Sequence, residues 1–276
     1  MLDPSIGLAL FAYNRPSHLR RVLIALEDYK IKNINVFIDG PKNTKDKVCQ
    51  EEIVFMLKTN KNLKSKIMLN KKNKGLAYSL INGITKMSKK YKSIIILEDD
   101  CVPRREFFDF VLKNLKKYNL EKKISAICGY QFPELHEKKS KILKSIFLNN
   151  FMPWGWAIWS EKWIEFIINK KNYPKNLKKS KIISKLEKKI KNKKNIWTLD
   201  FIKYCFINKK YFIFPNKSLI KNIGFDGTGI NSQSTFKFNT FYTKSNKIDI
   251  LKKISKDKKK DFIQQKTILK RINLFY

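Results

Sequence analysis

Short apolar runs alternate with amphipathic stretches through the first half of the chain. Each run is bounded by turn-forming residues, which predicts a buried strand, and the stretches between the runs carry apolar residues at helical spacing. The predicted strands are 6–13, 34–38, 66–69, 93–97 and 124–128, and the predicted helices between them lie near 17–26, 45–59, 75–87 and 104–118. This alternation predicts an α/β fold in which an open, mostly parallel sheet carries helices on both faces.

The second half of the chain has a less regular pattern. Residues 146–151 and 211–214 predict strands, while 197–207 and the stretch from Ser160 predict helices. Residues 153–156 indicate an aromatic turn, and the Lys-rich span 169–195 indicates either a helix with an exposed face or a loop. We therefore expect a smaller C-terminal region beside the regular α/β part.

Polar side chains follow three of the predicted strands at the point where each strand ends. Asn14 and Arg15 follow the first strand, Asp39 follows the second, and the acidic triplet 98–100 follows the fourth. Because ligands of open α/β sheets bind at the carboxyl ends of the strands, we expect the functional site at this edge.

The acidic triplet Glu98-Asp99-Asp100 is the strongest chemical signal in the sequence. Three adjacent carboxylates repel one another, so a cation or solvent must relieve the repulsion. Hard divalent cations prefer oxygen ligands and can bridge carboxylates to phosphates. An exposed acidic turn is the alternative, but the triplet directly follows an apolar strand in a chain with only 23 acidic residues. The triplet therefore favours a metal or phosphate site.

Other polar residues of the first half could each have either a ligand-binding role or an ordinary structural role. Asp39 could accept a hydrogen bond from a nucleoside, or it could simply form the turn before Gly40 and Pro41. Lys74 and the helix that begins after Gly75 could add positive potential for phosphates, or they could be an ordinary helix start. The residues alone leave both pairs of alternatives open.

Two residues of the second half are candidates for direct contact with a substrate. Asp200 lies in an apolar, aromatic stretch, where a carboxylate could have a raised pKa and act as a general base. An exposed helix position explains Asp200 better when only its neighbours are considered. Trp156 belongs to a cluster of four tryptophans in 154–163, which could stack on a sugar ring or pack in the core. Neither His18 nor His136 has a sequence partner that indicates a metal site.

Charge is concentrated in two segments of the chain. The net charge is +37, yet residues 1–40 hold five basic and four acidic residues. Residues 169–195 hold twelve Lys and one Glu, and the chain from 244 onward holds eleven basic and three acidic residues. Because these segments mix Lys with Ile, Leu and Phe, they favour an anionic membrane surface or an acidic acceptor. No nucleic-acid-binding motif is present, so we expect no nucleic-acid partner.

The remaining sequence features indicate a cytoplasmic setting. The four cysteines have no zinc-like spacing, and Cys101 and Cys128 lie in apolar runs that suggest burial. The N-terminal residues show no signal-peptide pattern, and no apolar stretch has the roughly 18 residues that span a bilayer. We expect a cytoplasmic protein whose basic segments hold it on the inner face of the membrane.

The order of these motifs resembles the nucleotide-sugar domain of the GT-A glycosyltransferases. The residues that carry this resemblance are Asn14-Arg15-Pro16, Ile38-Asp39-Gly40, Asn73-Lys74-Gly75-Leu76 and Leu97-Glu98-Asp99-Asp100. The downstream order is similar to the N-acetylglucosaminyltransferase I group and its bacterial surface-glycan homologues, and its residues are Val102-Pro103, Phe107-Phe108, Gly155-Trp156, Trp197-Thr198-Leu199-Asp200 and Pro215-Asn216-Lys217-Ser218. The resemblance covers about residues 6–230.

The resemblance implies an inverting, metal-dependent sugar transfer. The donor it implies is a nucleotide sugar, with UDP-linked GlcNAc or a related hexose as the best match. The acceptor would be a hydroxyl of a surface glycan, such as lipopolysaccharide or capsule, or of a lipid-linked sugar. By the same mapping, Asp100 binds Mn²⁺ or Mg²⁺, Glu98 and Asp99 contact sugar and ribose, Asp39 binds the nucleoside, and Asp200 is the catalytic base.

The resemblance also divides the chain and completes the predicted site. Residues 1–130 would be the Rossmann-like nucleotide-sugar half, 131–240 the half with the acceptor and catalytic base, and 241–276 a basic tail. The remaining residues that we expect in the nucleotide-sugar site are Asn14, Arg15, Lys74, Gly75 and Trp156.

Two features depart from the family pattern, and two other functions stay open. No histidine lies near the end of the loop 224–231, and the span 169–195 has no counterpart. A basic nucleic-acid-binding protein is one alternative, although it leaves the acidic triplet unexplained. A catalytically silent sugar-nucleotide-binding protein is the other, and only the activity of Asp200 variants separates it from a transferase.

Overall fold

A computed structural model describes residues 2–137, 139–170, 183–184, 187–188, 197–228, 234–240, 247–250 and 256–271. The strands of its main sheet are β1 (Ile6–Ala12), β2 (Asn33–Ile38), β3 (Lys64–Leu69), β4 (Ser93–Glu98), β6 (Ile124–Cys128), β7 (Ile142–Leu148), β8 (Trp156–Trp159), β9 (Tyr211–Pro215) and β11 (Lys247–Asp249). The helices are α1 (Pro16–Asp28), α2 (Thr44–Thr59), α3 (Leu76–Ser88), α4 (Phe107–Lys117), α5 (Ser160–Asn169), α7 (Trp197–Ile207) and α8 (Lys258–Arg271), with a 3₁₀ turn η1 (Pro133–Leu135).

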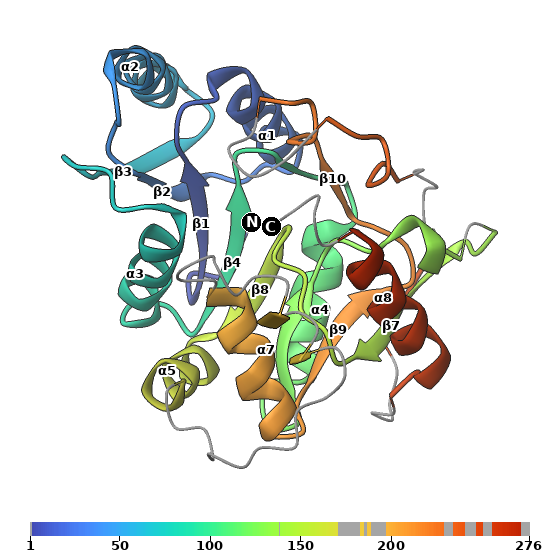
Figure 1. The fold of residues 1–276 in the computed structure, drawn as a ribbon. Coiled ribbons are helices and arrows are strands. Elements are labelled where there is room, and N and C mark those ends of the chain that lie inside the picture. Colours follow the sequence, from blue (N-terminus) through green and yellow to red (C-terminus); the bar gives the residue numbers. More distant parts are fainter. Residues whose placement is uncertain are drawn as a thin grey trace.

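One nine-stranded sheet runs through both halves of the chain, in the order β11-β7-β9-β6-β8-β4-β1-β2-β3. Strands β3, β2, β1 and β4 are parallel neighbours, and helices cover both faces of the sheet (Figure 1). The predicted α/β fold with an open, mostly parallel sheet is therefore confirmed. A separate antiparallel pair, β5 (Cys101–Pro103) and β10 (Ile220–Asn222), follows the acidic triplet.

The structure corrects two expectations for the second half. The sequence predicted a turn at 153–156, but Trp156 begins β8, an antiparallel strand between β4 and β6. All four residues of β8 are buried, so the strand has no alternation of apolar and polar positions that a sequence could reveal. The strand expected at 146–151 is β7, which begins and ends earlier, at Ile142 and Leu148.

The start of α1 also differs from the expectation. The helix begins at Pro16 with Arg15 at the N-cap, and no side chain caps it, whereas the sequence predicted a helix near 17–26. Proline suits the first position of a helix because its fixed φ is helical and it lacks an N–H that would need a partner. Arg15 consequently sits at the junction between β1 and α1, where its side chain can reach the neighbouring strand end.

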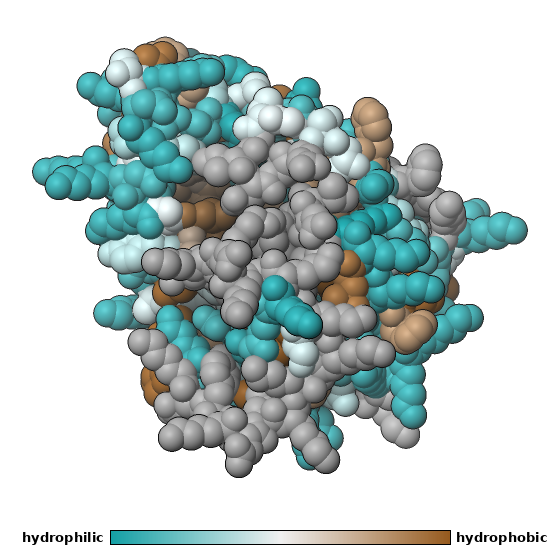
Figure 2. Space-filling model, in the orientation of Figure 1, coloured by the Kyte–Doolittle hydropathy of each residue, from teal (hydrophilic) through white to brown (hydrophobic). Residues whose placement is uncertain are grey.

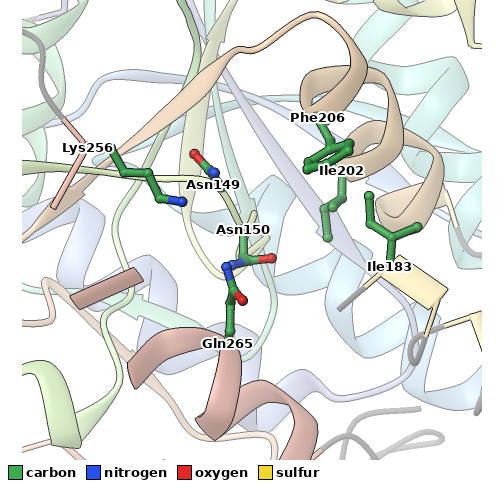
Figure 3. Close-up of a pocket in the computed structure, with 7 residues that line it drawn as sticks. All are labelled: Asn149, Asn150, Ile183, Ile202, Phe206, Lys256 and Gln265. Carbon is green, nitrogen blue, oxygen red and sulfur yellow. The ribbon is translucent and has the colours of Figure 1, made fainter. Parts of the chain in front are cut away.

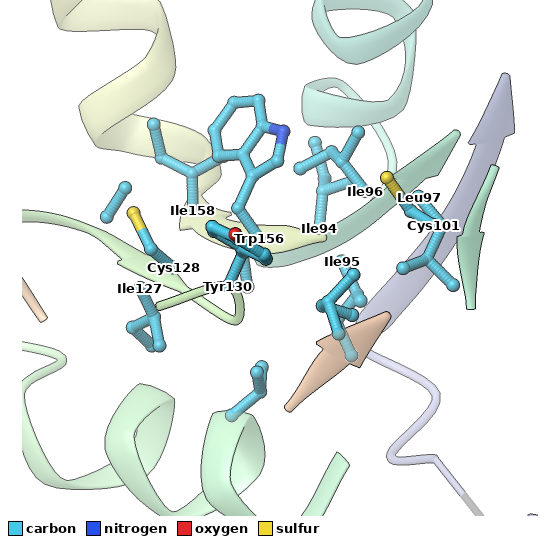
Figure 4. Close-up of a cluster of buried hydrophobic side chains, with 14 of the residues drawn as sticks. Ile94, Ile95, Ile96, Leu97, Cys101, Ile127, Cys128, Tyr130, Trp156 and Ile158 are labelled. Atoms are coloured by element: carbon cyan, nitrogen blue, oxygen red, sulfur yellow. The ribbon is translucent and has the colours of Figure 1, made fainter. Parts of the chain in front are cut away.

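The core is apolar and aromatic around β4 and β8. The side chains of Ile94–Leu97, Ile158 and Trp156 pack beside Cys128 and Tyr130 (Figure 4). Trp156 stacks on Trp197 with 5.7 Å between ring centroids. Such aromatic contacts contribute about 1 kcal/mol beyond the burial of area, and this one holds the first turn of α7 against β8.

The described surface is mostly hydrophilic on the face shown in Figure 2, where hydrophobic side chains form only small separate areas. Within the described residues, no helix is long and apolar enough to cross a membrane. Cys101 and Cys128 are buried, as the sequence suggested, and so is Cys205. Most of the basic span 169–195 and much of the tail from 241 lie outside the described residues.

Candidate functional site

The predicted site residues gather at one edge of the sheet, where β1, β2 and β4 end. Arg15 follows β1, Asp39 follows β2, and the acidic triplet begins with the last residue of β4. The parallel register places Phe11 of β1 opposite Glu98 of β4. This register brings the loop after β1 directly against the triplet.

Arg15 neutralises two of the three carboxylates. One guanidinium nitrogen, Nη2, lies 2.5 Å from Asp99 Oδ1 and 2.8 Å from Asp100 Oδ2. The backbone N–H of Tyr13 donates to the other oxygen of Asp99 at 3.3 Å. Burial opposes the charge of Arg15, but the two carboxylates outweigh it and raise the pKa of Arg15 above its ordinary value. The cation that the triplet needs is thus supplied, at least in part, by the chain itself.

Burial changes the acidity of the triplet. Burial raises the pKa of Glu98, and the carboxylates of Asp100 and Asp99 raise it further, against the opposing effect of Arg15. Burial also raises the pKa of Asp99, although its contacts with Arg15 oppose the rise. Glu98 therefore holds a proton more readily than an ordinary glutamate and can donate a hydrogen bond to a ligand oxygen.

A loop from the second half of the chain packs onto this cluster. The backbone N–H of Ile223 donates to the carbonyl of Asp100 at 2.9 Å. A Cβ at Gly224 would lie 2.2 Å from Asp100 Oδ2, so only glycine permits this close approach. Two residues further on, Asp226 Oδ2 lies 3.0 Å from His18 Nε2 in α1. The loop therefore contacts both the acidic triplet and α1.

Asp39 is used by the chain itself. Its carboxylate accepts hydrogen bonds from the backbone N–H of Lys74 at 3.1 Å and of Gly75 at 2.7 Å, and from Asn70 Nδ2 at 3.2 Å. These bonds satisfy N–H groups that the start of α3 leaves without helical partners. Asp39 thereby fixes the N-terminus of α3 at the edge of the sheet, and a nucleoside contact would replace one of these bonds.

Asn14 is held by an aspartate that the sequence analysis did not select. Asp46 accepts from Asn14 Nδ2 and from the hydroxyl of Tyr13, both at 2.6 Å. Burial and the contact with Asp46 raise the pKa of Tyr13, so the phenol stays protonated and continues to donate. These bonds tie the loop after β1 to the first turn of α2. A lone acidic residue near a helix start gives no sequence signal for such a role.

Lys74 and Gly75 lie at the same edge, where their backbone N–H groups donate to Asp39. Lys74 is exposed, and its Nζ lies 3.2 Å from the hydroxyl of Tyr78 and 4.7 Å from the centre of that ring. Gly75 has φ +87, a left-handed conformation that favours glycine, and no atom lies within 4 Å of the position of a Cβ. The backbone at Gly75 is therefore open on the side from which a side chain would project.

Trp156 and Asp200 differ in their exposure to solvent. Trp156 is fully buried in the core, so it presents no face on which a sugar could stack in this structure. Asp200 lies one helical turn after Trp197 and is partly buried, and burial raises its pKa although Lys203 and Lys170 oppose the rise. Trp197 stacks on Trp156, and Trp156 pairs with Ile96 in β4. The first turn of α7 therefore lies close to β4, the strand that leads into the acidic triplet.

The described residues fit a divalent metal ion only in part. Within them, no three His, Cys, Asp or Glu side chains converge on a point that could hold a metal ion. Asp100 could supply one carboxylate, but its Oδ2 is paired with Arg15 and its Oδ1 lies 3.3 Å from the thiol of Cys101. Any ion would need most of its ligands from a bound substrate.

The fold and this edge define an α/β protein with a charge-paired polar site at the carboxyl ends of its strands. No protein-family model matches the sequence, and no curated protein sequence does. A similar solved structure is the mannosyltransferase PcManGT from Pyrobaculum calidifontis in complex with GDP-Man and Mn²⁺, with a TM-score of 0.42, 12% identity, and coverage of 68% of this chain and 52% of that one. This chain thus spans about half the length of that protein.

A second similar structure is that of mouse xyloside xylosyltransferase 1 in its apo form. Its TM-score is 0.40 at 10% identity, with coverage of 75% of this chain and 84% of that one. Both proteins are named as glycosyltransferases, but likenesses this low carry no argument about the activity of this chain.

Proposed function

We propose that this protein is a glycosyltransferase that moves a sugar from a nucleotide-sugar donor to a hydroxyl group of an acceptor. The observation that carries the proposal is the cluster of Arg15, Asp99 and Asp100 at the carboxyl edge of the sheet, the edge at which Asp39 also fixes the start of α3. Open α/β sheets bind ligands at this edge. The order of the surrounding motifs also resembles the nucleotide-sugar domain of the GT-A glycosyltransferases.

The donor's diphosphate suits the positive groups at this edge. Arg15 can bind phosphate oxygens through a guanidinium nitrogen, and Lys74 is exposed beside the start of α3, where the helix adds positive potential. Asp99 and Glu98 offer oxygen atoms to sugar and ribose hydroxyls. Asn14 and Asp39 keep the loops after β1 and β2 in place through their bonds to Asp46 and to α3.

Asp200 is the proposed catalytic base. It would take the proton of the acceptor hydroxyl while that oxygen attacks the anomeric carbon. The bond from the anomeric carbon to the diphosphate breaks in the same step, so the nucleoside diphosphate leaves with the electron pair and the configuration inverts. Burial supports this role because it raises the pKa of Asp200 towards the range in which a carboxylate takes up a proton readily.

A divalent ion, Mn²⁺ or Mg²⁺, is part of the proposal and would be held by Asp100 and the donor's phosphates. It would stabilise the negative charge that develops on the leaving diphosphate. Arg15 already supplies a positive charge beside Asp100, so the separate contributions of ion and arginine have to be measured. The preferred donor is UDP-GlcNAc or a related hexose, and the preferred acceptor is a surface glycan or a lipid-linked sugar at an anionic membrane.

Calorimetric titration tests the proposal. UDP, GDP and their sugars are titrated into the protein with Mn²⁺ and with a chelator, and the titrations are repeated with Asp100→Ala and with Asp28→Ala. Asp28 is exposed at the end of α1, so its variant controls for the loss of one negative charge. We expect one nucleotide class to bind in the presence of Mn²⁺, with binding lost only in Asp100→Ala. Absence of nucleotide binding under every condition refutes the proposal.

A further inference from the structure

A cavity of about 150 Å³ lies between the C-terminal half of α7, the helix α8 and the segment that follows β7. Its lining residues are Asn149, Asn150, Ile183, Ile202, Phe206, Lys256 and Gln265 (Figure 3). The cavity has room for roughly ten water molecules. That volume admits one sugar ring but not a nucleotide sugar.

The cavity is separate from the cluster of Arg15, Asp99 and Asp100. Strand β9 runs in the same direction as β4, because β6 and β4 are both antiparallel to β8 and β9 is parallel to β6. Strand β7 runs the opposite way, and its last residue, Leu148, pairs with Phe212 near the start of β9. The segment with Asn149 and Asn150 therefore leaves the sheet at the edge opposite the acidic triplet.

Amide groups at this place lack hydrogen-bond partners. Asn150 is only 1% exposed, and its Nδ2 has no partner within the described part of the chain. The same holds for Oδ1 of Asn149, which also lines the cavity. A buried amide group without a partner costs free energy, so a bound molecule or ordered water has to satisfy it.

The charges around the cavity cancel. Lys256 Nζ lies 2.7 Å from Asp261 Oδ2, and Asp261 also accepts from the backbone N–H of Asn149 at 2.8 Å and from Gln265 Nε2 at 2.7 Å. The groups left to bind a molecule are therefore neutral amides. Amides both donate and accept, which suits hydroxyl groups better than phosphate or carboxylate.

The opposite wall is apolar. Ile183, Ile202 and Phe206 lie across from the amide side chains (Figure 3). A sugar ring has the matching character, because its C–H groups form an apolar face while its hydroxyls point outward from the rim. A purely apolar ligand would leave the amides unpaired, and a fully polar one would leave the apolar wall uncovered.

We infer that this cavity binds a neutral sugar unit. Under the proposed function, on which the assignment of this sugar to an acceptor rests, it is a non-reacting unit of the acceptor glycan. Phe206 lies six residues after Asp200 in α7, which corresponds to roughly 9 Å along the helix axis. Asp200 and Ile202 also project from different sides of α7. The sugar in the cavity is thus not the one that reacts at Asp200, and the acceptor has more than one sugar unit.

The test uses saccharides alone, without nucleotide or metal. N-acetylglucosamine, glucose, galactose, mannose and their disaccharides are titrated into the whole protein, and binding is followed by ligand-observed NMR. The titrations are repeated with Asn150→Ala and Asn119→Ala. Asn119 is an exposed asparagine after α4 and serves as the matched control. Thermal denaturation verifies that each variant is folded, and Gln265→Ala replaces Asn150→Ala if that variant does not fold.

We expect at least one saccharide to bind, with affinity about fivefold weaker in Asn150→Ala and unchanged in Asn119→Ala. Absence of saccharide binding at millimolar concentrations overturns the inference, as does binding that Asn150→Ala leaves unchanged. Titration of nucleotides into Asn150→Ala distinguishes the sugar-binding cavity from the proposed nucleotide-sugar site, because the substitution should leave nucleotide binding unchanged. Saccharide binding without any nucleotide binding refutes the proposed transferase and leaves this cavity as a sugar site.

Discussion

Replacement of Arg15 by methionine tests whether the chain itself balances the charge of the acidic triplet. The substitution keeps most of the apolar stem and removes the guanidinium that contacts Asp99 and Asp100. The side chain of Asp99 is only 5% exposed, so its carboxylate would be left buried without its cation. Breaking a buried ion pair in this way costs about 3–5 kcal/mol. We expect the low end, about 3 kcal/mol, because the side chain of Arg15 is 18% exposed and partly solvated.

Chemical denaturation of four proteins measures this effect. They are the wild type, Arg15→Met, Asp99→Asn and the double variant. The double variant should recover part of the lost stability, since it no longer leaves the buried Asp99 carboxylate unpaired, although Asp100 still lacks its cation, and the coupling free energy should be at least about 2 kcal/mol. Arg20→Met is the matched control, because Arg20 is 59% exposed and lies 3.8 Å from Glu52, an arrangement that contributes less than about 1 kcal/mol.

Two results would contradict the reasoning. One is a loss in Arg15→Met no larger than in Arg20→Met, which would mean that solvent rather than Arg15 balances the triplet. The other is additive behaviour of Arg15→Met and Asp99→Asn, which would mean that the two side chains do not interact in solution.

Three further predictions concern other parts of the molecule. Gly224→Ala should weaken nucleotide binding about tenfold, because its Cβ would meet Asp100 Oδ2 at 2.2 Å, whereas alanine at the exposed Asn119 should leave calorimetric binding unchanged. Asp200→Asn should abolish sugar transfer without weakening nucleotide binding, and transfer that survives would remove Asp200 as the base. Burial lowers the pKa of Lys162 from 10.5 to about 8. Between these two pH values the unfolded chain keeps the proton that the folded protein has lost, so the free energy of unfolding should rise with pH across this range. Lys162→Met should remove that rise when denaturation is compared at both ends of the range.

The regular half of the fold was predictable because β1, β2, β4 and β6 are short, mostly apolar and almost entirely buried. Runs such as 93–97 can be read without knowing their neighbours, and the carboxyl edge follows from the parallel connection of β1, β2 and β4. Strand β8 could not be found in this way. Its residues are all buried and follow directly on a Trp-rich turn, so neither period nor polarity distinguishes it, and its antiparallel place between β4 and β6 depends on pairing at long range.

The candidate site was predictable in its position but not in its contacts. The sequence placed Arg15 and the triplet at one edge, yet it treated them as separate ligands for a nucleotide sugar and a metal ion. Their direct contact depends on the register between β1 and β4, which no local pattern encodes. The contact of His18 with Asp226 joins residues far apart in the chain, so no local pattern in the sequence indicates it.

The carboxylates of this edge are matched by donors from the chain before any ligand arrives. Asp99 and Asp100 have Arg15, Asp39 has the N–H groups at the start of α3, and Asp226 has His18. Arg15 can bind a donor phosphate only by giving up part of its contact with a carboxylate, so one charge-assisted interaction replaces another. The net gain from that exchange is small, even though each interaction is strong by itself. Under the proposed function, most of the affinity for a nucleotide sugar then comes from contacts with the base and the sugar, which also makes these contacts the source of specificity.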